Sequence, residues 1–280
     1  MSGGMSGEPS GDQNNISIWL ESGTARLGYD PEQAKLSLYY GDKSRLSIEL
    51  KDVAMGIVDE LSDDYSYDPT YLRDEYGPTK PAGFDWVSPT VGEYSKDDTH
   101  LTIELEIMGK AGTLKLSVSD ANRFSAKLTP PKGLPIAYLR VGARVDPTEG
   151  FYGLGEVFDV VNHRGKIRPM HIVPEFEVES GINDAHAPIP LLLGTTGWGV
   201  FVESYYPTVF EVAVDADDAV AFAVGTAGEG DNSVFFHLFA DEHPLDLTRH
   251  YYEQTGWPKL PAQWALGPWV WRDENKDQAE

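Results

Sequence analysis

The feature that most constrains this chain is a two-residue alternation of apolar and polar side chains. It recurs at residues 35–40 (KLSLYY), 45–50 (RLSIEL), 100–107 (HLTIELEI) and 113–118 (TLKLSV). Successive side chains of a β-strand point to opposite faces, so this period places one face on an apolar core and the other in water. The pattern predicts antiparallel strands.

Three later segments are more continuously apolar, at residues 190–193, 198–202 and 233–240. Such runs are typical of central strands that are buried on both faces. Many short strands with closely spaced turn signals indicate a mainly β fold, an antiparallel β-sandwich.

One helix is predicted, over residues 244–255 (PLDLTRHYYEQT). Pro244 suits the first helical position, and Gly256 followed by Pro258 predicts the end. Residues 264–271 (WALGPWVW) are nearly all apolar, which predicts a strand buried on both sides, as in a parallel sheet or barrel. Only nine polar residues follow, so we expect the sequence to be cut within a larger fold.

Residues 59–89 interrupt the alternation, being rich in Asp, Tyr, Pro and Gly. This segment is interpreted as an irregular excursion whose aromatic side chains dock back onto the sandwich. It is either a solvated surface loop or a loop that contacts a ligand or partner.

The composition excludes several classes of function. With 22 Lys and Arg against 45 Asp and Glu, the net charge is −23, so the chain would repel nucleic-acid backbones. No run approaches the ~20 apolar residues that a membrane span requires. The absence of cysteine removes thiolate nucleophiles and cysteine-ligated metals.

The first 15 residues (MSGGMSGEPSGDQNN) predict a flexible leader and lack the pattern of a signal peptide. A processed secreted protein, a lipid-tethered protein and an expression leader all fit this composition. The compartment therefore stays open.

Motifs for cofactors are absent or incomplete. The histidines lack metal-ligand spacing, and Gly153-Leu154-Gly155 lacks the third glycine and the helix of a dinucleotide fingerprint. There is no GxSxG elbow. We expect no cofactor and no metal, and we interpret His237, in the apolar run VFFHLF, as a hydrogen-bonded residue of the sandwich.

Two acidic or polar patterns remain. Glu175, Glu177 and Glu179 alternate along one segment, either as a solvated strand edge or as a carboxylate cluster suited to acid/base chemistry. Around them lie FYGLGE (151–156), NHRG (162–165) and GWGVF (197–201). Glycine, Asn, Asp, His, Glu and Trp together suit the binding of sugar hydroxyls and ring faces, so carbohydrate is the expected ligand class.

At these residues the sequence resembles the N-terminal part of glycoside hydrolase family 31, the family of α-glucosidases and α-xylosidases. The resemblance is carried by three blocks in the family's order, at residues 151–156 (FYGLGE), 188–204 (PIPLLLGTTGWGVFVES) and 243–269 (HPLDLTRHYYEQTGWPKLPAQWALGPW).

The resemblance implies a galactose-mutarotase-like β-sandwich over residues 16–258, after the leader at 1–15. It implies that residues 259–280 begin a (β/α)8 catalytic barrel whose first strand is 264–271. Family members use two barrel aspartates in a retaining mechanism, and the nucleophile motif is absent from this sequence. We therefore assign no catalytic residue, and expect this chain alone to be inactive without its own C-terminal barrel.

The resemblance also implies substrate-binding residues for an α-glycoside. A sandwich loop of the family reaches the sugar pocket, and its counterpart here is residues 171–186. The first barrel strand would end at the active site. The candidates are Glu175, Glu177, Glu179, Asp184, His186, Trp271, Arg272 and Asp273.

Two alternatives remain open. A free-standing mutarotase-like epimerase would pair His171 or His186 with Glu156 or Glu175 as acid and base. A carbohydrate-binding module without catalysis would use exposed aromatic residues between positions 65 and 86.

Overall fold

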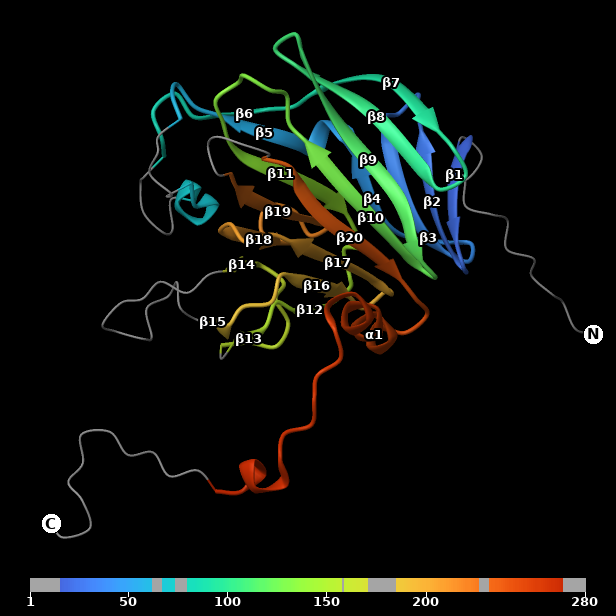
Figure 1. Cartoon of the computed structure of the whole chain (residues 1–280), viewed down its shortest axis with the longest axis vertical. Helices are drawn as coiled ribbons and strands as arrows, with labels where there is room; N and C mark the ends of the chain where they lie inside the picture. Colours follow the sequence, from blue (N-terminus) through green and yellow to red (C-terminus); the bar gives the residue numbers. More distant parts are fainter. Residues whose placement is uncertain are drawn as a thin grey trace, which may run out of the picture.

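Two antiparallel sheets face each other in the computed structural model, which describes residues 16–61, 67–73, 80–157, 159–170, 185–226 and 232–268 (Figure 1). In spatial order, the first sheet (sheet A) contains β1 (Ile18–Ser22), β2 (Ala25–Asp30), β3 (Lys35–Tyr40), β4 (Lys43–Glu49), β11 (Ile136–Arg144), β19 (Ala219–Gly225), β18 (Thr208–Val212) and β14 (Lys166–Pro169). It also contains β5 (Val53–Ile57), paired with β11, and β6 (Asp85–Val87), paired with β5.

The second sheet (sheet B) has the order β12 (Phe151–Gly153), β16 (Leu191–Gly194), β17 (Trp198–Glu203), β20 (Val234–Ala240), β10 (Arg123–Thr129), β9 (Lys110–Asp120), β8 (His100–Ile107) and β7 (Thr90–Lys96). A separate pair joins β13 (Glu156–Val157) to β15 (Ala185–Ala187). The predicted mainly β sandwich is confirmed.

The alternation predicted from sequence is the basis of the core. In β8, Leu101, Ile103, Leu105 and Ile107 are buried, whereas Glu104 and Glu106 are exposed. Leu139, Val141 and Ala143 of β11 face the same core from sheet A. The strands predicted at 35–40 and 100–107 have the observed bounds of β3 and β8.

The continuously apolar segments form strands with two buried faces, as predicted. β16 is buried along its whole length and β17 along all but its last residue. Their outer face is covered by α1 (Pro244–Thr255), whose Leu247 packs with Leu193, Phe201 and Phe239. The helix begins and ends where the sequence predicts, and Gly256 has the positive φ of +107° that favours glycine.

The described aromatic side chains of the excursion are buried or half-buried, which weakens the basis of the binding-module alternative, whereas Tyr65 and Tyr76 lie outside the described residues. Tyr67, Phe84 and Trp86 surround the buried Tyr138 on the outer face of β11. The ring centroids of Tyr67 and Tyr138 lie 5.8 Å apart in an edge-to-face arrangement. Docking was expected, and it occurs because it removes these rings from water. The segment also contains η3 (Pro69–Leu72), a 3-10 helix, and β6.

The strand predicted at residues 264–271 is wrong in its first part, where η5 (Gln263–Leu266) forms a 3-10 helix. Trp264 is 82% exposed and Leu266 is 71% exposed. A β-strand needs a neighbour to satisfy its backbone hydrogen bonds, and no described strand pairs with this segment. Residues 269–271 lie outside the described residues. The domain boundary at 258/259 stays a prediction.

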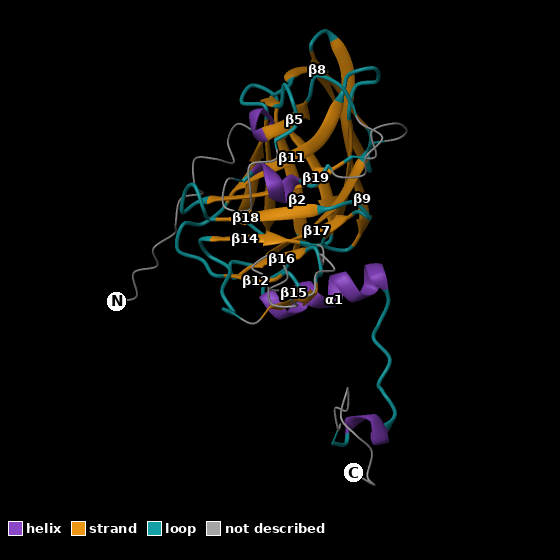
Figure 2. Cartoon of the chain, turned by 90° about the vertical axis from the view of Figure 1, so that its left-hand side faces the viewer, coloured by secondary structure: helices purple, strands orange, loops and turns teal. Residues whose placement is uncertain are grey.

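Among the described residues, no helix combines the length and apolar character needed to cross a membrane. Helix α1 has 12 residues and lies against sheet B (Figure 2).

A buried carboxylate holds the connection by which the chain passes from β11 in sheet A to β12 in sheet B. Glu149, only 4% exposed, accepts hydrogen bonds from the indole Nε1 of Trp198 at 2.9 Å and from the backbone and hydroxyl of Thr196. Burial raises the pKa of Glu149, although these donors oppose that shift. Trp198 is completely buried, so the pair also fixes the start of β17.

Replacing Trp198 with phenylalanine should lower the free energy of unfolding by about 1–3 kcal/mol, because the buried carboxylate loses a donor that water does not replace. Urea unfolding measures this loss. Trp257→Phe is the matched control: this tryptophan is 61% exposed, and its replacement should change the free energy by less than about 0.5 kcal/mol. Equal effects of the two substitutions would contradict the role given to Glu149.

Candidate functional site

The residues predicted to bind substrate fall almost entirely outside the described part of the chain. This holds for Glu175, Glu177, Glu179, Asp184, Trp271, Arg272 and Asp273. The backbone of His186 lies in β15. Their roles stay predictions. The structure does describe where the chain enters and leaves residues 171–184, here called the N-terminal and C-terminal stems of that loop.

The N-terminal stem is β14, the edge strand of sheet A. It pairs with β18, with Arg168 opposite Phe210 and Pro169 opposite Val209. The backbone N–H of Met170 then donates to the carbonyl of Thr208 at 2.7 Å. The backbone is therefore hydrogen-bonded up to the last residue before the loop.

A buried arginine braces this stem from inside. Arg168 is 3% exposed and donates through Nη2 to Asp159 at 2.6 Å and through Nε to Nδ1 of His163 at 3.1 Å. The Nε2 of His163 lies 2.9 Å from the carbonyl oxygen of Gly153. Since arginine only donates, Nδ1 must accept, and Nε2–H donates to Gly153. The hydrogen bonds thus select one neutral tautomer of His163.

The ionisation of this cluster follows from its burial. For Asp159, burial opposes the charged form, but hydrogen bonds from Arg168 and Lys166 outweigh it and lower the pKa well below its usual range. For His163, burial is the main cause that lowers the pKa below 6.5, and the nearby Arg168 charge acts in the same direction. The cluster is therefore an ion pair with a neutral histidine attached.

The C-terminal stem is β15, which pairs with β13 so that Glu156 lies opposite Ala187. Gly155 has φ +88°, and a Cβ on it would overlap the carbonyl oxygen of Ala187. Gly153 has φ +101°, and a Cβ on it would likewise overlap the carbonyl oxygen of Leu191. The two glycines of the Gly-Leu-Gly motif therefore allow the backbone to pass close to the backbone at Ala187 and Leu191, an approach that a residue with a Cβ would prevent.

Both stems lie at the end of the sandwich that carries helix α1. In Figure 1 and Figure 2, β14, β15 and α1 occupy the same half of the molecule. The chain leaving α1 at Gly256 extends from that end (Figure 1). Both stems and the exit from α1 therefore lie in the same half of the molecule.

The pairing of β13 with β15 also brings together two residues of the epimerase alternative. Glu156 lies opposite Ala187 in β15, the strand that carries His186. The Glu156 side chain is exposed. The role of this pair as acid and base stays a prediction.

His237 is a structural residue, as predicted. Its Nδ1 lies 3.0 Å from Ser125 Oγ and its Nε2 lies 2.9 Å from Glu203, and the ring stacks on Phe201. Across the described part of the chain, no group of three or more His, Cys, Asp or Glu residues is arranged to hold a metal ion.

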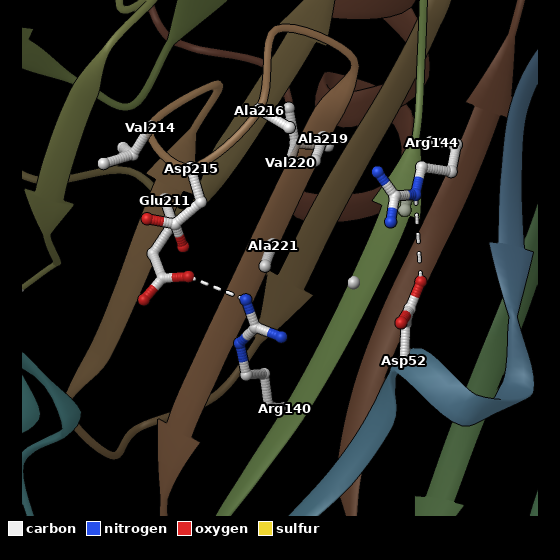
Figure 3. Close-up of a pocket in the computed structure, with 12 residues that line it drawn as sticks. Asp52, Arg140, Arg144, Glu211, Val214, Asp215, Ala216, Ala219, Val220 and Ala221 are labelled. Atoms are coloured by element: carbon white, nitrogen blue, oxygen red, sulfur yellow. Dashed lines mark hydrogen bonds and ion pairs between the residues drawn. The ribbon is translucent and has the colours of Figure 1, made fainter. Parts of the chain in front are cut away.

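The sequence analysis missed a polar pocket of about 170 Å³ on the outer face of sheet A (Figure 3). Its charged walls come from Asp52, Arg140, Arg144, Glu211 and Asp215. Alternation along β11 places Arg140 and Arg144 on one face, so the sequence could have predicted that these two charges share a surface. The carboxylates come from distant segments that only the sheet pairing brings near. This feature is called the outer-face pocket below.

The His163 cluster predicts an acid-sensitive contribution to stability. Because the folded-state pKa is depressed, the contribution is complete above the unfolded pKa of 6.5 and is lost as the pH falls through the folded value. The free energy of unfolding should fall from about pH 7.5 to about pH 5.5, and His163→Gln should remove part of that fall.

Urea unfolding at the two pH values checks this prediction. His243→Gln is the control, since His243 is exposed and should leave the pH dependence unchanged. A His163→Gln protein with the wild-type pH dependence would contradict the assignment of a neutral, buried imidazole.

Comparison with known proteins supports the family resemblance over part of the chain. Residues 75–211 match the family described as "Glycosyl hydrolase 31 N-terminal galactose mutarotase-like domain". An isomaltosyltransferase of Sporosarcina globispora is 24% identical over 218 residues, which are 69% of this chain and 19% of that protein. The α-xylosidase XylQ of Lactiplantibacillus pentosus is 27% identical over 147 residues, covering 52% of this chain and 18% of that protein.

The fold agrees. A family 31 sulfoquinovosidase from E. rectale superposes with a TM-score of 0.55 at 17% identity, over 82% of this chain and 34% of that chain. The chain thus spans about a fifth of the length of the two curated relatives. The resemblance found in the sequence is confirmed: residues 75–211 match the N-terminal galactose mutarotase-like domain of glycosyl hydrolase 31, and the structure is the β-sandwich that this resemblance predicts.

Proposed function

We propose that this chain is the sandwich domain of a retaining α-glycosidase and that its own part in the reaction is to present residues 171–186 to the sugar pocket. The catalytic aspartates would belong to a barrel that continues from residue 259. The curated relatives are an isomaltosyltransferase and an α-xylosidase, which act on sugars. Those activities support an α-glycoside as the substrate class.

The observation that carries the proposal is the fixed geometry of the two stems. The N-terminal stem is braced by buried Arg168 and its partners. The C-terminal stem is held by the β13–β15 pair and the crossing at Gly155. Fixing both ends of a loop reduces the conformational entropy that it loses when its polar side chains are ordered on binding. Glu175, Glu177, Glu179, Asp184 and His186 are the side chains it would present.

The sandwich would position substrate and would leave bond cleavage to the barrel. Carboxylates and histidine in the loop would accept and donate hydrogen bonds to sugar hydroxyls. Trp271, Arg272 and Asp273, at the end of the first barrel strand, would line the other side of the same pocket. Loss of a loop contact should therefore weaken substrate binding more than it slows the chemical step.

The test compares this 280-residue chain with a protein extended through whatever the gene encodes after Glu280. Hydrolysis of aryl α-glycosides is expected only from the extended protein. In that protein, at least one substitution among Glu175→Gln, Glu177→Gln, Glu179→Gln, Asp184→Asn and His186→Gln should raise KM by about ten-fold, equivalent to ~1.4 kcal/mol. The effect on kcat should be smaller.

Glu93→Gln is the matched control, because Glu93 is an exposed glutamate on β7 of sheet B and should leave KM unchanged. Unchanged KM in all five loop variants would overturn the role of the loop. Mutarotation of α-glucose by the short chain, abolished by Glu156→Gln or His186→Gln, would establish the epimerase instead.

A further inference from the structure

The outer-face pocket is floored by small residues of two paired strands. In β11 the side chains of Leu139, Val141 and Ala143 enter the core, so Gly142 faces outward. It lies opposite Ala221 of β19, and the next outward position of β19 is Ala219. Because Gly142 has no side chain and the two alanines have only methyl groups, no large side chain covers the sheet surface at these positions.

This floor is bare for a local reason. A Cβ on Gly142 would lie 3.2 Å from the Cβ of Asp52 and 3.8 Å from Nη1 of Arg140. Asp52 and the guanidinium of Arg140 therefore border the floor at this glycine. The methyl groups of Ala219 and Ala221 make the rest of the floor apolar and flat.

The walls alternate donors with acceptors. Arg140 donates through Nη2 to Glu211 at 2.8 Å, and Arg144 donates to Asp218 at 3.2 Å and lies 3.9 Å from Asp52. Figure 3 shows the two guanidinium groups directed over the floor from different sides, with Glu211 and Asp215 along one wall. Asp215 is 67% exposed, so its carboxylate lies at the rim.

The charge balance selects the class of ligand. Two arginines, Arg140 and Arg144, and three carboxylates, Asp52, Glu211 and Asp215, line the pocket. Arg73, outside the lining, pairs with Glu211 at 3.4 Å and with Asp215 at 3.5 Å. The carboxylates, which already pair with the arginines, would repel an anion. The guanidinium groups would repel a cation. A hydroxyl group both donates and accepts, so it can bridge an arginine N–H and a carboxylate oxygen at the same time.

The volume sets the size of the ligand. At about 170 Å³ the pocket is smaller than the ~300–1,000 Å³ typical of sites for drug-sized molecules. It has room for a single small ring with its hydroxyl groups. The methyl groups of the alanines would pack against the C–H face of that ring, and the charged side chains of the walls would form hydrogen bonds with its hydroxyl groups.

We propose that the outer-face pocket is a binding site for one neutral monosaccharide unit, such as the end of a glycan, and that it is separate from the loop at residues 171–186. Arg140 and Glu211 are the central contacts, and Gly142, Ala219 and Ala221 make the floor. No bond is made or broken there. The proposal stands without the proposed function, because none of its residues belongs to the loop or to the barrel.

The experiment is a titration of the ¹⁵N-labelled 280-residue chain, followed by amide chemical shifts. The probes are methyl α-D-glucopyranoside, methyl α-D-galactopyranoside and methyl α-D-xylopyranoside. At least one should give saturable shifts centred on the amides of Gly142, Glu211 and Ala221. Glucuronate should bind more weakly than the neutral glucoside, because it adds a negative charge beside three carboxylates.

Two variants test the pocket by different means. Arg140→Met removes the central donor, and Ala219→Val narrows the floor with a residue suited to a strand while keeping every ion pair. Each should weaken binding by about ten-fold or more, equivalent to ~1.4 kcal/mol. Lys127→Met is the control, because it also replaces a cationic side chain with methionine. Lys127 lies over the Phe235 ring on the outer face of sheet B, so its replacement should leave binding unchanged.

Three outcomes would overturn the proposal. One is the absence of saturable shifts at the pocket with all three glycosides. Another is shifts confined to Glu156 and Ala187, which would locate sugar binding at the loop stems and leave the proposed function intact. The third is full-strength binding by a folded Ala219→Val protein, with folding checked by the dispersion of its amide spectrum.

Discussion

The sandwich depends on one constraint: two sheets must share a single apolar core, so every strand that faces it needs an apolar side chain at alternate positions. β8 supplies Leu101, Ile103, Leu105 and Ile107 from sheet B, and β11 supplies Leu139, Val141 and Ala143 from sheet A. The area removed from water between these faces is the main favourable contribution to folding. All polar residues of the same strands are thereby directed outward, where the outer-face pocket forms.

Two of the buried charged residues lie where the chain changes sheet or leaves it. Glu149 lies in the connection from β11 to β12 and is satisfied by the indole of Trp198 and by Thr196. Arg168 lies at the edge strand β14 and is satisfied by Asp159 and His163. Burial of unpaired charge would be costly, and in both places the partners offset that cost. These polar clusters fix connections that an apolar core, being non-directional, leaves undetermined.

The same architecture gives the domain two separate polar surfaces. One is the pair of stems at the α1 end of the sandwich, which belongs to the region that matches the family domain. The other is the outer-face pocket, built on β11, β18 and β19. They differ in construction, because the first is a pair of stems that flank a loop, whereas the second takes Arg140, Arg144 and Glu211 from strands, Asp52 from the 3-10 helix Leu50–Asp52 and Asp215 from the turn after β18.

The sequence by itself determined the local elements. A two-residue period sets which side chains share a face, so β3, β8 and the apolar strands β16, β17 and β20 were predictable, as was α1 with its proline start and glycine end. Family blocks in the sequence also indicated the domain type. The candidate loop residues could be named from that resemblance, but their placement lies outside the described part of the chain.

Only the tertiary structure decided which strands become neighbours. Backbone hydrogen bonds are alike for every residue, so alternation does not specify a partner. The pairing of β11 with β19, and of β19 with β18, brings Arg140 to Glu211 across 71 positions of sequence. Among the described strands none pairs with Gln263–Leu266, which forms a 3-10 helix in place of the predicted strand. The apolar character of a segment favours burial, and the neighbours available to it decide whether it is buried and which conformation it takes.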